Sequence, residues 1–308
     1  MWKITVSITV NSMENFHLLK LLYFKGEAMI NLSISEQLAY STIRISTDTG
    51  TGTGFFYKFS EKESGFHVPA IVTNKHVIAG AKQGQFLLTL ADENGEPQDN
   101  THFTCSFDKF EERWVPHPEA DIDLCAMPIV PILKELEKQS KNAFFIPIDK
   151  TLIPTTQELK DFKLVEDILM VGYPNGLWDK VNNMPLFRKG ITSSHPHLDW
   201  NGKKEMLIDA ACFPGSSGSP VFLLNEGGYV DKKGNTNLGG TRIKLLGVLY
   251  AGPQHTASGE IQIVNVPTSN KPMAITGIPN NIGIVIKTEK LTDLDDVFTN
   301  LADKNGEI

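Results

Sequence analysis

The feature that most constrains this chain is a succession of short apolar segments, each bounded by turn-forming residues such as Gly, Pro, Asn and Asp. About a dozen such segments follow one another at fairly regular spacing, which is typical of β-barrels and β-sandwiches rather than of alternating strands and helices. The predicted strands span residues 40–46, 54–58, 68–73, 86–90, 103–107, 124–129, 168–171, 187–192, 206–209, 221–224, 244–250 and 282–287. The sequence therefore predicts an all-β fold.

Two segments depart from this pattern and are predicted to be helices. Residues 132–140 follow Pro131, and proline is favourable at the first position of a helix. Residues 291–302 place their apolar side chains on one helical face. Two polar stretches rich in Gly, Asn and Pro, residues 225–241 and 253–279, are predicted to be long loops.

Composition excludes several classes of protein. The 308 residues are 41% hydrophobic and 21% charged, so the chain has enough apolar surface to fold into one large domain or two modest ones. The net charge of −7 argues against a nucleic-acid partner, because binding phosphates requires a basic surface. No run of residues approaches the ~20 apolar residues of a membrane-spanning helix. We therefore expect neither a nucleic-acid partner nor a membrane partner.

The cysteines and histidines do not form a metal-binding pattern. Cys105, Cys125 and Cys212 are an odd number and lack C-x-x-C spacing, which argues against a disulfide framework and against a structural zinc site. His195 and His197 have H-x-H spacing without an evident third ligand, so we interpret them as part of a surface loop. No metal is expected.

Residues 1–28 differ in character from the rest of the chain. Their densest apolar stretch, residues 18–24, is interrupted by Lys20 and is too short for the core of a signal peptide. We predict an N-terminal extension that is not part of the fold and a folded domain over residues 29–308. Without an export signal, and with free cysteines, the expected location is the cytoplasm.

Three short segments beside predicted strands carry the residues of a possible active site. The first contains His76, the second contains Asp121 and Asp123, and the third contains Ser217. A serine hydroxyl is a weak nucleophile until an imidazole takes its proton, and a carboxylate orients that imidazole. The order His, Asp, Ser is that of the chymotrypsin arrangement, whereas α/β-hydrolases run Ser, Asp, His.

These segments resemble those of trypsin-like serine proteases. The run T-N-K-H-V-I around His76 is similar to a bacterial T-N-x-H-V form, and G-S-S-G-S-P around Ser217 resembles G-x-S-G-[GS]-P. Gly52–Phe55 resembles the G-x-G-F strand of the first barrel, and the likeness is nearest to bacterial glutamyl endopeptidases and related single-domain peptidases.

The resemblance implies a chymotrypsin-like double barrel, with two six-stranded antiparallel β-barrels and a C-terminal helix. The first barrel would span about residues 38–130, the second about residues 145–290, and the helix about residues 290–302.

The resemblance also implies a role for each site residue. Ser217 would attack the scissile carbonyl, and His76 would act as general base and then as general acid. The backbone N–H groups of Gly215 and Ser217 would form the oxyanion hole. No cofactor is implied.

Two aspartates are candidates for the carboxylate of the triad. The family pattern places a small buried residue two positions after the Asp. Counting from Asp123 places Cys125 there, whereas counting from Asp121 places the charged Asp123 in the core, which is costly. Asp123 is favoured, and Asp121 remains the alternative.

The substrate pocket is also assigned by resemblance. Ala211 would line its floor, and the wall strand would run along Leu249, Tyr250, Ala251 and Gly252. Neither Ala211 nor Leu249 carries a charge, so an apolar or small residue is expected before the scissile bond.

The predicted function is that of a serine endopeptidase that acts on a protein or peptide substrate through an acyl-enzyme. Two alternatives remain open: a catalytically silent binding subunit of a larger complex, and an esterase that uses the same triad. In digestive relatives, a newly cleaved N-terminal ammonium pairs with an Asp immediately before the nucleophile, and this ion pair forms the oxyanion hole. Here that position is Ser216, which carries no charge, so the oxyanion hole should be set by the geometry of its own loop. Control would then come from the long loops or from a regulatory protein partner.

Overall fold

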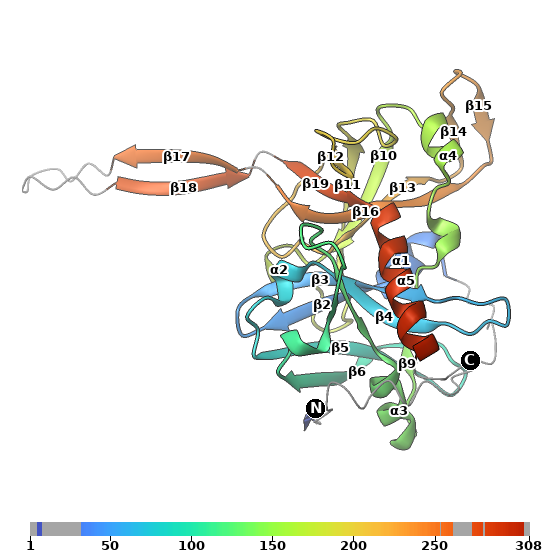
Figure 1. The fold of residues 1–308 in the computed structure, drawn as a ribbon, viewed down its shortest axis with the longest axis vertical. Helices are drawn as coiled ribbons and strands as arrows, with labels where there is room; N and C mark the ends of the chain where they lie inside the picture. The colour runs from blue at the N-terminus through green and yellow to red at the C-terminus, as the bar shows by residue number, and fades with distance from the viewer. Residues whose placement is uncertain (1–4, 8–31, 253, 261–272, 280, 305–308) are drawn as a thin grey trace, which may run out of the picture.

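Two β-sheet units lie next to each other, and the C-terminal helix α5 (Glu289–Lys304) packs against both (Figure 1). The computed structural model describes residues 5–7, 32–252, 254–260, 273–279 and 281–304. The fold is mostly β, as predicted, and it is that of a chymotrypsin-like double barrel.

The second unit is a closed six-stranded barrel in which every neighbouring pair of strands is antiparallel. Closure leaves this sheet without an open edge, and its apolar interior contains Met170, Ile208, Val221 and Leu246. The strands, in their order around the barrel, are β10 (Asp167–Gly172), β11 (Leu186–Thr192), β12 (Glu205–Asp209), β19 (Ile282–Lys287), β16 (Arg242–Ala251) and β13 (Pro220–Asn225).

The first unit is a sheet of nine strands in the order β1-β6-β5-β2-β3-β4-β8-β7, with β9 paired to β5. It holds its own apolar cluster, which includes Phe86, Phe107 and Phe110. The strands are β1 (Thr5–Ser7), β2 (Thr42–Thr47), β3 (Thr51–Phe59), β4 (Val68–Thr73), β5 (Gln83–Ala91), β6 (Pro97–Asp108), β7 (Val115–Pro116), β8 (Cys125–Pro128) and β9 (Ala143–Phe144).

Strand β3 is buried on both faces because it lies between two apolar clusters. Phe56 packs into the interior of the first unit, while Phe55 and Tyr57 face a cluster shared with the second unit and α5. Alternate side chains of a strand point to opposite faces, so a strand between two cores reads as a continuous apolar run. In α5, Phe298 stacks on Phe59 of β3 with ring centroids 4.5 Å apart.

Every strand predicted from the sequence overlaps a strand of the structure, and both predicted helices are present as α3 (Val130–Lys138) and α5. Three short helices were not predicted: α1 (Ile34–Tyr40), α2 (Lys75–Ile78) and α4 (Thr156–Asp161). Each has only one or two turns, so its apolar periodicity is too brief to read. The described residues also form 3₁₀ turns at Glu111–Arg113, Lys150–Leu152 and Pro174–Gly176.

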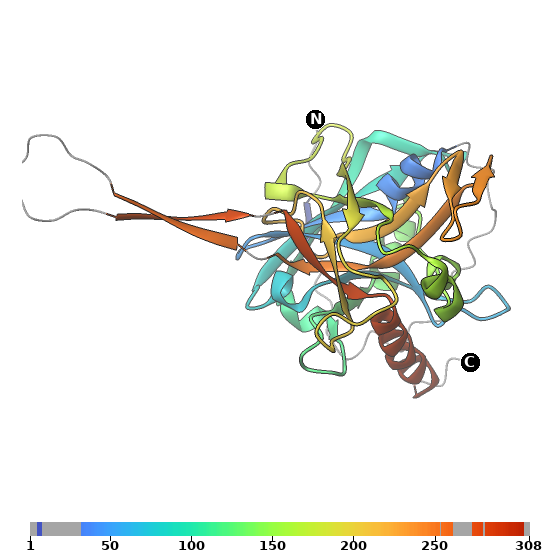
Figure 2. The same cartoon turned by 90° about the horizontal axis from the view of Figure 1, so that it is seen from above.

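The prediction of loops at residues 225–241 and 253–279 was wrong for the described parts of those stretches. The first contains a hairpin of β14 (Gly228–Val230) and β15 (Thr236–Leu238), and the second contains β17 (Gln254–Glu260) paired with β18 (Met273–Pro279). In the first hairpin, Asp231 accepts the backbone N–H groups of Lys233 and Asn235 and so closes a tight polar turn. The β17–β18 hairpin extends away from the two units in both views (Figures 1 and 2).

Of residues 1–28, the structure describes only β1, which pairs in parallel with β6, and the rest lies outside the described residues. The predicted domain boundary near Met29 and the predicted barrel limits remain predictions. Across the described ranges, no helix has both the length and the apolar character needed to cross a membrane.

Candidate active site

His76 and Asp123 meet at one edge of the first unit, where the end of strand β4 lies beside the start of its partner strand β8. Strands β4 and β8 are antiparallel, with Thr73 opposite Cys125, so the end of β4 lies beside the start of β8. His76 follows β4 in the short helix α2, and Asp123 precedes β8. The Asn74 side chain donates to the Asp123 carbonyl at 2.7 Å and fixes the spacing between the two segments.

Both carboxylate oxygens of Asp123 bind the same histidine. Nδ1 of His76 lies 2.5 Å from Oδ2, and the backbone N–H of His76 donates to Oδ1 at 3.0 Å. A carboxylate at Nδ1 favours the tautomer that has its proton there, which leaves Nε2 free to accept a proton. The His76 side chain is 49% exposed, so a substrate has access to the ring.

Of the two aspartates considered from the sequence, the structure brings Asp123 to the histidine. Asp121 is solvent-exposed in the turn before it. Leu124 and Cys125, which follow Asp123, are buried at 0% and 1% exposure. This burial agrees with the expectation that the strand after the carboxylate begins in the core.

Ser217 lies in a tight loop whose backbone requires two glycines. Gly215 and Gly218 have φ values of 85° and 87°, which L-residues with a side chain rarely adopt. A Cβ atom on Gly218 would lie 1.9 Å from the carbonyl oxygen of Thr53. The loop therefore approaches β3 so closely that only hydrogen fits at this position.

Thr53 of β3 joins the serine loop to the histidine segment. Its N–H donates to the Ser217 carbonyl at 2.9 Å, and its hydroxyl donates to the Gly215 carbonyl at 2.9 Å. Its own carbonyl accepts the hydroxyl of Thr73 at 2.7 Å, just before the segment that carries His76. The loop of the second unit is thus attached to the edge of the first unit at which His76 and Asp123 meet.

Two peptide groups of the loop are oriented by hydrogen bonds to their carbonyls. The Pro214 carbonyl accepts the Asn175 N–H at 2.5 Å, and the Ser216 carbonyl accepts the Ser219 N–H at 3.0 Å. In a trans peptide the carbonyl and the following N–H point in opposite directions. The N–H groups of Gly215 and Ser217 are therefore directed away from these internal contacts, and within the described residues no backbone carbonyl accepts either of them. Two such N–H groups are suited to stabilise an oxyanion.

The predicted pocket wall lies beside the serine loop. Leu249 accepts the Gly218 N–H at 2.8 Å and donates to the Ser219 carbonyl at 2.9 Å, so β16 runs alongside the loop through Tyr250 and Ala251 to Gly252. The Tyr250 hydroxyl donates to Glu205 Oε1 at 2.8 Å. Burial of the ring and the neighbouring Glu205 both raise the pKa of Tyr250, so it stays a neutral donor.

Two residues beside the predicted pocket wall, Cys212 and Gly283, were not predicted from the sequence. A Cβ atom on Gly283 of β19 would lie 2.8 Å from Cys212 Sγ, and one on Gly252 would lie 3.8 Å from Cys212 Cβ. Cys212, which follows Ala211, therefore fills the space between two strands that have glycine at this level. Burial raises the pKa of the Cys212 thiol to about 11, so the thiol is neutral, and its side chain packs against the apolar interior of the second barrel. The one signal for these residues in the sequence is Gly283, and its position opposite the wall strand is known only once the register between β16 and β19 is known.

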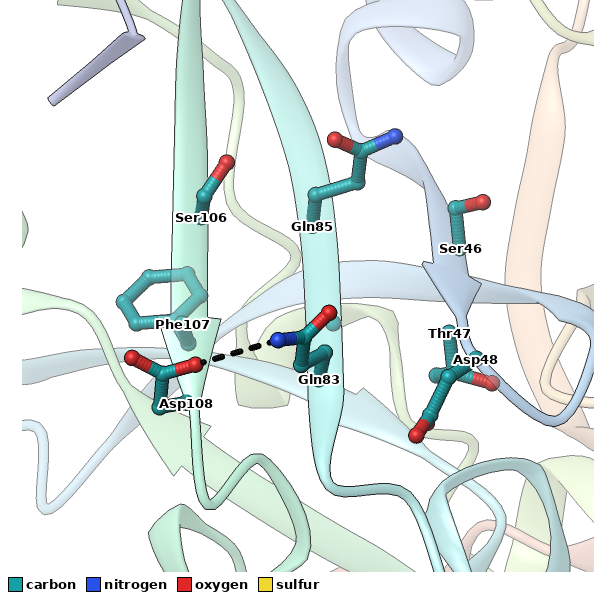
Figure 3. A pocket seen from close by; sticks show the side chains of 9 residues that line it. Ser46, Thr47, Asp48, Gln83, Gln85, Ser106, Phe107 and Asp108 are labelled. Atoms are coloured by element: carbon teal, nitrogen blue, oxygen red, sulfur yellow. Dashed lines mark hydrogen bonds between the residues drawn. The ribbon is translucent and has the colours of Figure 1, made fainter. Parts of the chain in front are cut away.

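Two other features play no part in this constellation. His195 and His197 lie in the loop between β11 and β12 with ring centroids 6.4 Å apart, and the described residues contain no group of three or more potential metal ligands. A cavity of about 360 Å³ lies on the first unit, between β2, β5 and β6, and contains none of the predicted site residues (Figure 3). Polar side chains line it, among them Gln83, whose Nε2 lies 3.5 Å from Oδ1 of Asp108.

The fold and the site together define the class of chymotrypsin-like double-barrel proteins. The trypsin-like peptidase domain family matches residues 52–230, which is more than half of the 308-residue chain. The chain belongs to the trypsin-like peptidase family. No curated protein matches the sequence.

Several solved structures are similar over most of the chain. The inactive form of Rv3671c from Mycobacterium tuberculosis H37Rv is 14% identical, with 89% of this chain and 94% of that chain covered and a TM-score of 0.41. The serine protease of human pathogenic astrovirus is 12% identical, with 81% and 90% covered and a TM-score of 0.38. The HtrA-type protease AlgW with a decapeptide is 14% identical, with 88% and 66% covered and a TM-score of 0.41.

Proposed function

We propose that this protein is a serine endopeptidase in which His76, Asp123 and Ser217 act as a catalytic triad. The observation that carries the proposal is the pair of contacts from Asp123 to His76, at an edge to which Thr53 attaches the Ser217 loop. The substrate would be a protein or a peptide, and no cofactor takes part in the proposed reaction.

The reaction would begin with transfer of the Ser217 hydroxyl proton to Nε2 of His76. The serine oxygen bonds to the carbonyl carbon of the scissile peptide, and the carbonyl oxygen takes up the negative charge. The N–H groups of Gly215 and Ser217 donate to that oxygen, while Asp123 stabilises the imidazolium.

The bond to the leaving group would then break. His76 gives its proton to the departing amine, and the remaining acyl group is an ester of Ser217. A water molecule attacks this ester, with His76 as base again, and releases the new carboxyl terminus together with the free serine. Atoms and charges balance over the two halves, and the enzyme returns to its starting state.

The walls of the substrate pocket support a preference for a small or apolar residue before the scissile bond. Ala211, Cys212, Leu249 and Gly283 carry no charged side chain, and the nearby cation of Arg188 is bound by the Ala211 carbonyl and by Ser216 Oγ. An uncharged pocket discriminates against charged side chains because they would lose solvation without gaining a partner. Tyr250, Ala251 and Gly252 would pair with the backbone of the substrate.

A fluorophosphonate probe tests the proposal directly. Wild-type protein should be labelled, the labelled tryptic peptide should carry the probe on Ser217, and Ser217→Ala should not be labelled. His76→Ala should also lose labelling, because the serine would lack its base. Labelling of Ser217→Ala at full rate would refute the assignment of the nucleophile.

Peptide and ester substrates assayed side by side separate the endopeptidase from the two alternatives. Turnover of both, lost together in Ser217→Ala, supports the proposal. Turnover of esters alone would make the protein an esterase. Specific peptide binding without labelling or turnover would make it a silent binding subunit.

A further inference from the structure

Arg188 of β11 contacts three residues of the segment that leads into the serine loop. One guanidinium nitrogen, Nη1, donates to the Ala211 carbonyl and also to Ser216 Oγ, the latter at 3.2 Å. The guanidinium carbon lies 5.0 Å from the centre of the Phe213 ring, within the range of a cation–π contact. A single side chain thus binds both ends and the middle of the segment from Ala211 to Ser216.

The direction of approach shows which side of the loop Arg188 occupies. Ser216 is 2% exposed, so its hydroxyl points into the protein, whereas the neighbouring Ser217 is partly exposed. Because Arg188 binds the buried hydroxyl, its cation lies behind the loop.

The charge of Arg188 has no carboxylate partner within the described part of the chain. Its acceptors there are a carbonyl and a hydroxyl, and the guanidinium remains protonated at any ordinary pH. A half-buried cation is costly to desolvate, and neutral acceptors offset that cost less well than a carboxylate does. A cation held in this way produces a positive potential at the loop that carries Gly215 and Ser217.

The loop needs such an anchor because of its glycines. Gly215 can rotate more freely than other residues, so its peptide group has alternatives to the orientation that frees its N–H. Asn175 holds the preceding Pro214 carbonyl from one side. Arg188 holds the carbonyl of Ala211 and the hydroxyl of Ser216 on either side of that peptide.

We propose that Arg188 is a positioning residue that keeps the Ala211–Ser216 segment in the conformation in which the Gly215 and Ser217 amides point outward together. This inference rests on the proposed peptidase function. The sequence predicts that the geometry of the loop itself sets the oxyanion hole, and the proposal adds that the cation of Arg188 maintains this geometry. The buried Ser216 hydroxyl contributes by accepting a hydrogen bond from Arg188.

The test compares Arg188→Met, Arg188→Lys and the matched control Lys189→Met. Lys189 is the next residue of the same strand, and its exposed ammonium lies 3.8 Å from Asp167 on the surface. With a peptide substrate, Arg188→Met should lower kcat by about 10- to 100-fold and leave KM within about twofold, because the oxyanion exists only in the transition state. Arg188→Lys should recover part of the loss, and Lys189→Met should behave as wild type.

A transition-state analogue gives a readout that a merely structural role would not move. The affinity of a peptide aldehyde, which forms an oxyanion on Ser217, should fall in Arg188→Met by the same factor as kcat. The affinity of the corresponding peptide alcohol, which forms none, should stay unchanged. An equal loss for both ligands would overturn the proposal.

Ser216→Asp provides a second, independent test through a double-mutant comparison. With Arg188 present, the new carboxylate gains a cation, so Ser216→Asp should lower the rate of labelling less than it does in the Arg188→Met background. With Arg188→Met, the same carboxylate is buried without a partner, and labelling by the fluorophosphonate should be lost. If Ser216→Asp has the same effect in both backgrounds, Arg188 does not act through Ser216 and the proposal is wrong.

The failure of this inference is distinguishable from failure of the proposed function. If wild-type protein is not labelled at Ser217, the peptidase function fails. If wild-type protein is labelled and Arg188→Met keeps its full kcat, only the role of Arg188 fails. If Arg188→Met raises KM only for substrates with an acidic residue before the scissile bond, Arg188 is a pocket residue and the positioning role is overturned.

Discussion

The backbone N–H of Thr53 donates a 2.9 Å hydrogen bond to the carbonyl of Ser217, and this bond joins two segments far apart in the chain. Thr53 belongs to the first β unit and Ser217 precedes the first residues of β13 in the second. The Thr53 hydroxyl accepts the Tyr173 N–H at 3.0 Å and donates to the Gly215 carbonyl, so one threonine binds the serine loop and the end of β10 together. The relative position of the two units thus depends on a small polar centre inside an apolar interface.

Thr53→Val should weaken this centre while keeping the shape of the side chain. Loss of the hydroxyl leaves the Tyr173 amide without its acceptor and the Gly215 carbonyl without its donor, both in a fully buried place. Such losses cost about 1–3 kcal/mol of unfolding free energy. The free energy of unfolding measured in urea and kcat should both fall. Thr49→Val, on the exposed turn, should change neither. An unchanged kcat would show that the bridge does not influence catalysis.

Asp123→Asn should lower kcat by up to about 10⁴-fold, because an amide at Nδ1 favours the wrong imidazole tautomer. Asp121→Asn removes a charge of the same size from an exposed position nearby and should change kcat by less than about twofold. Steady-state kinetics on a peptide substrate would measure both. If the two variants ranked in the opposite order, Asp121 would be the catalytic carboxylate.

Gly218→Ala separates steric conflict from backbone strain when it is compared with Gly65→Ala. The two glycines have φ values of 87° and 82°, but a Cβ on Gly65 meets nothing within 4 Å, whereas one on Gly218 would overlap the Thr53 carbonyl. Gly65→Ala should cost about 1 kcal/mol of unfolding free energy. Gly218→Ala should cost clearly more and should abolish labelling of Ser217. Equal costs would mean that the loop can move away from β3.

The buried His117 predicts a pH dependence of stability. Its Nδ1 accepts the Glu119 N–H at 3.1 Å, and Nε2 lies 3.3 Å from Asp293 of α5, with Lys290 and Lys75 also near. Burial is the main cause that lowers the pKa of His117, so the folded state favours the neutral ring. This contribution is complete above the unfolded pKa of about 6.5 and declines as the pH falls toward the lower folded value.

In His117→Gln, Tm should therefore fall less between about pH 7 and pH 5 than it does in the wild-type protein. The glutamine keeps a hydrogen-bonding side chain and has no proton to take up. Thermal unfolding of both proteins over this range would measure the difference. A wild-type Tm that falls no faster than that of His117→Gln would contradict a neutral buried histidine.

Cys212 predicts a limit on the size of the residue before the scissile bond. Cleavage of a peptide library should return small or apolar residues at that position. Cys212→Leu adds volume between Gly252 and Gly283 and should raise KM for the larger of these residues more than for alanine. A strong wild-type preference for Glu, Lys or Arg would contradict this prediction, and for Glu the cation would be that of Arg188 at the Ala211 carbonyl.

Local patterns in the sequence were sufficient for much of this protein. Short apolar segments bounded by turn residues identified every long strand of the two units, because apolar runs and turn residues are local properties. The preference for Asp123 rested on Cys125, a small apolar residue two positions after it, and the structure has Cys125 buried.

Contacts between distant segments were decided only by the tertiary structure. Arg188 and Ser216, Cys212 and Gly283, and Thr53 and Ser217 lie far apart along the chain, and no local pattern marks them as neighbours. Their proximity follows from the closure of the second barrel and from the hydrogen bonds that attach the serine loop to β3. Side-chain identity determined which residues had the chemistry for catalysis, and the packing of the two units determined which other residues hold them in place.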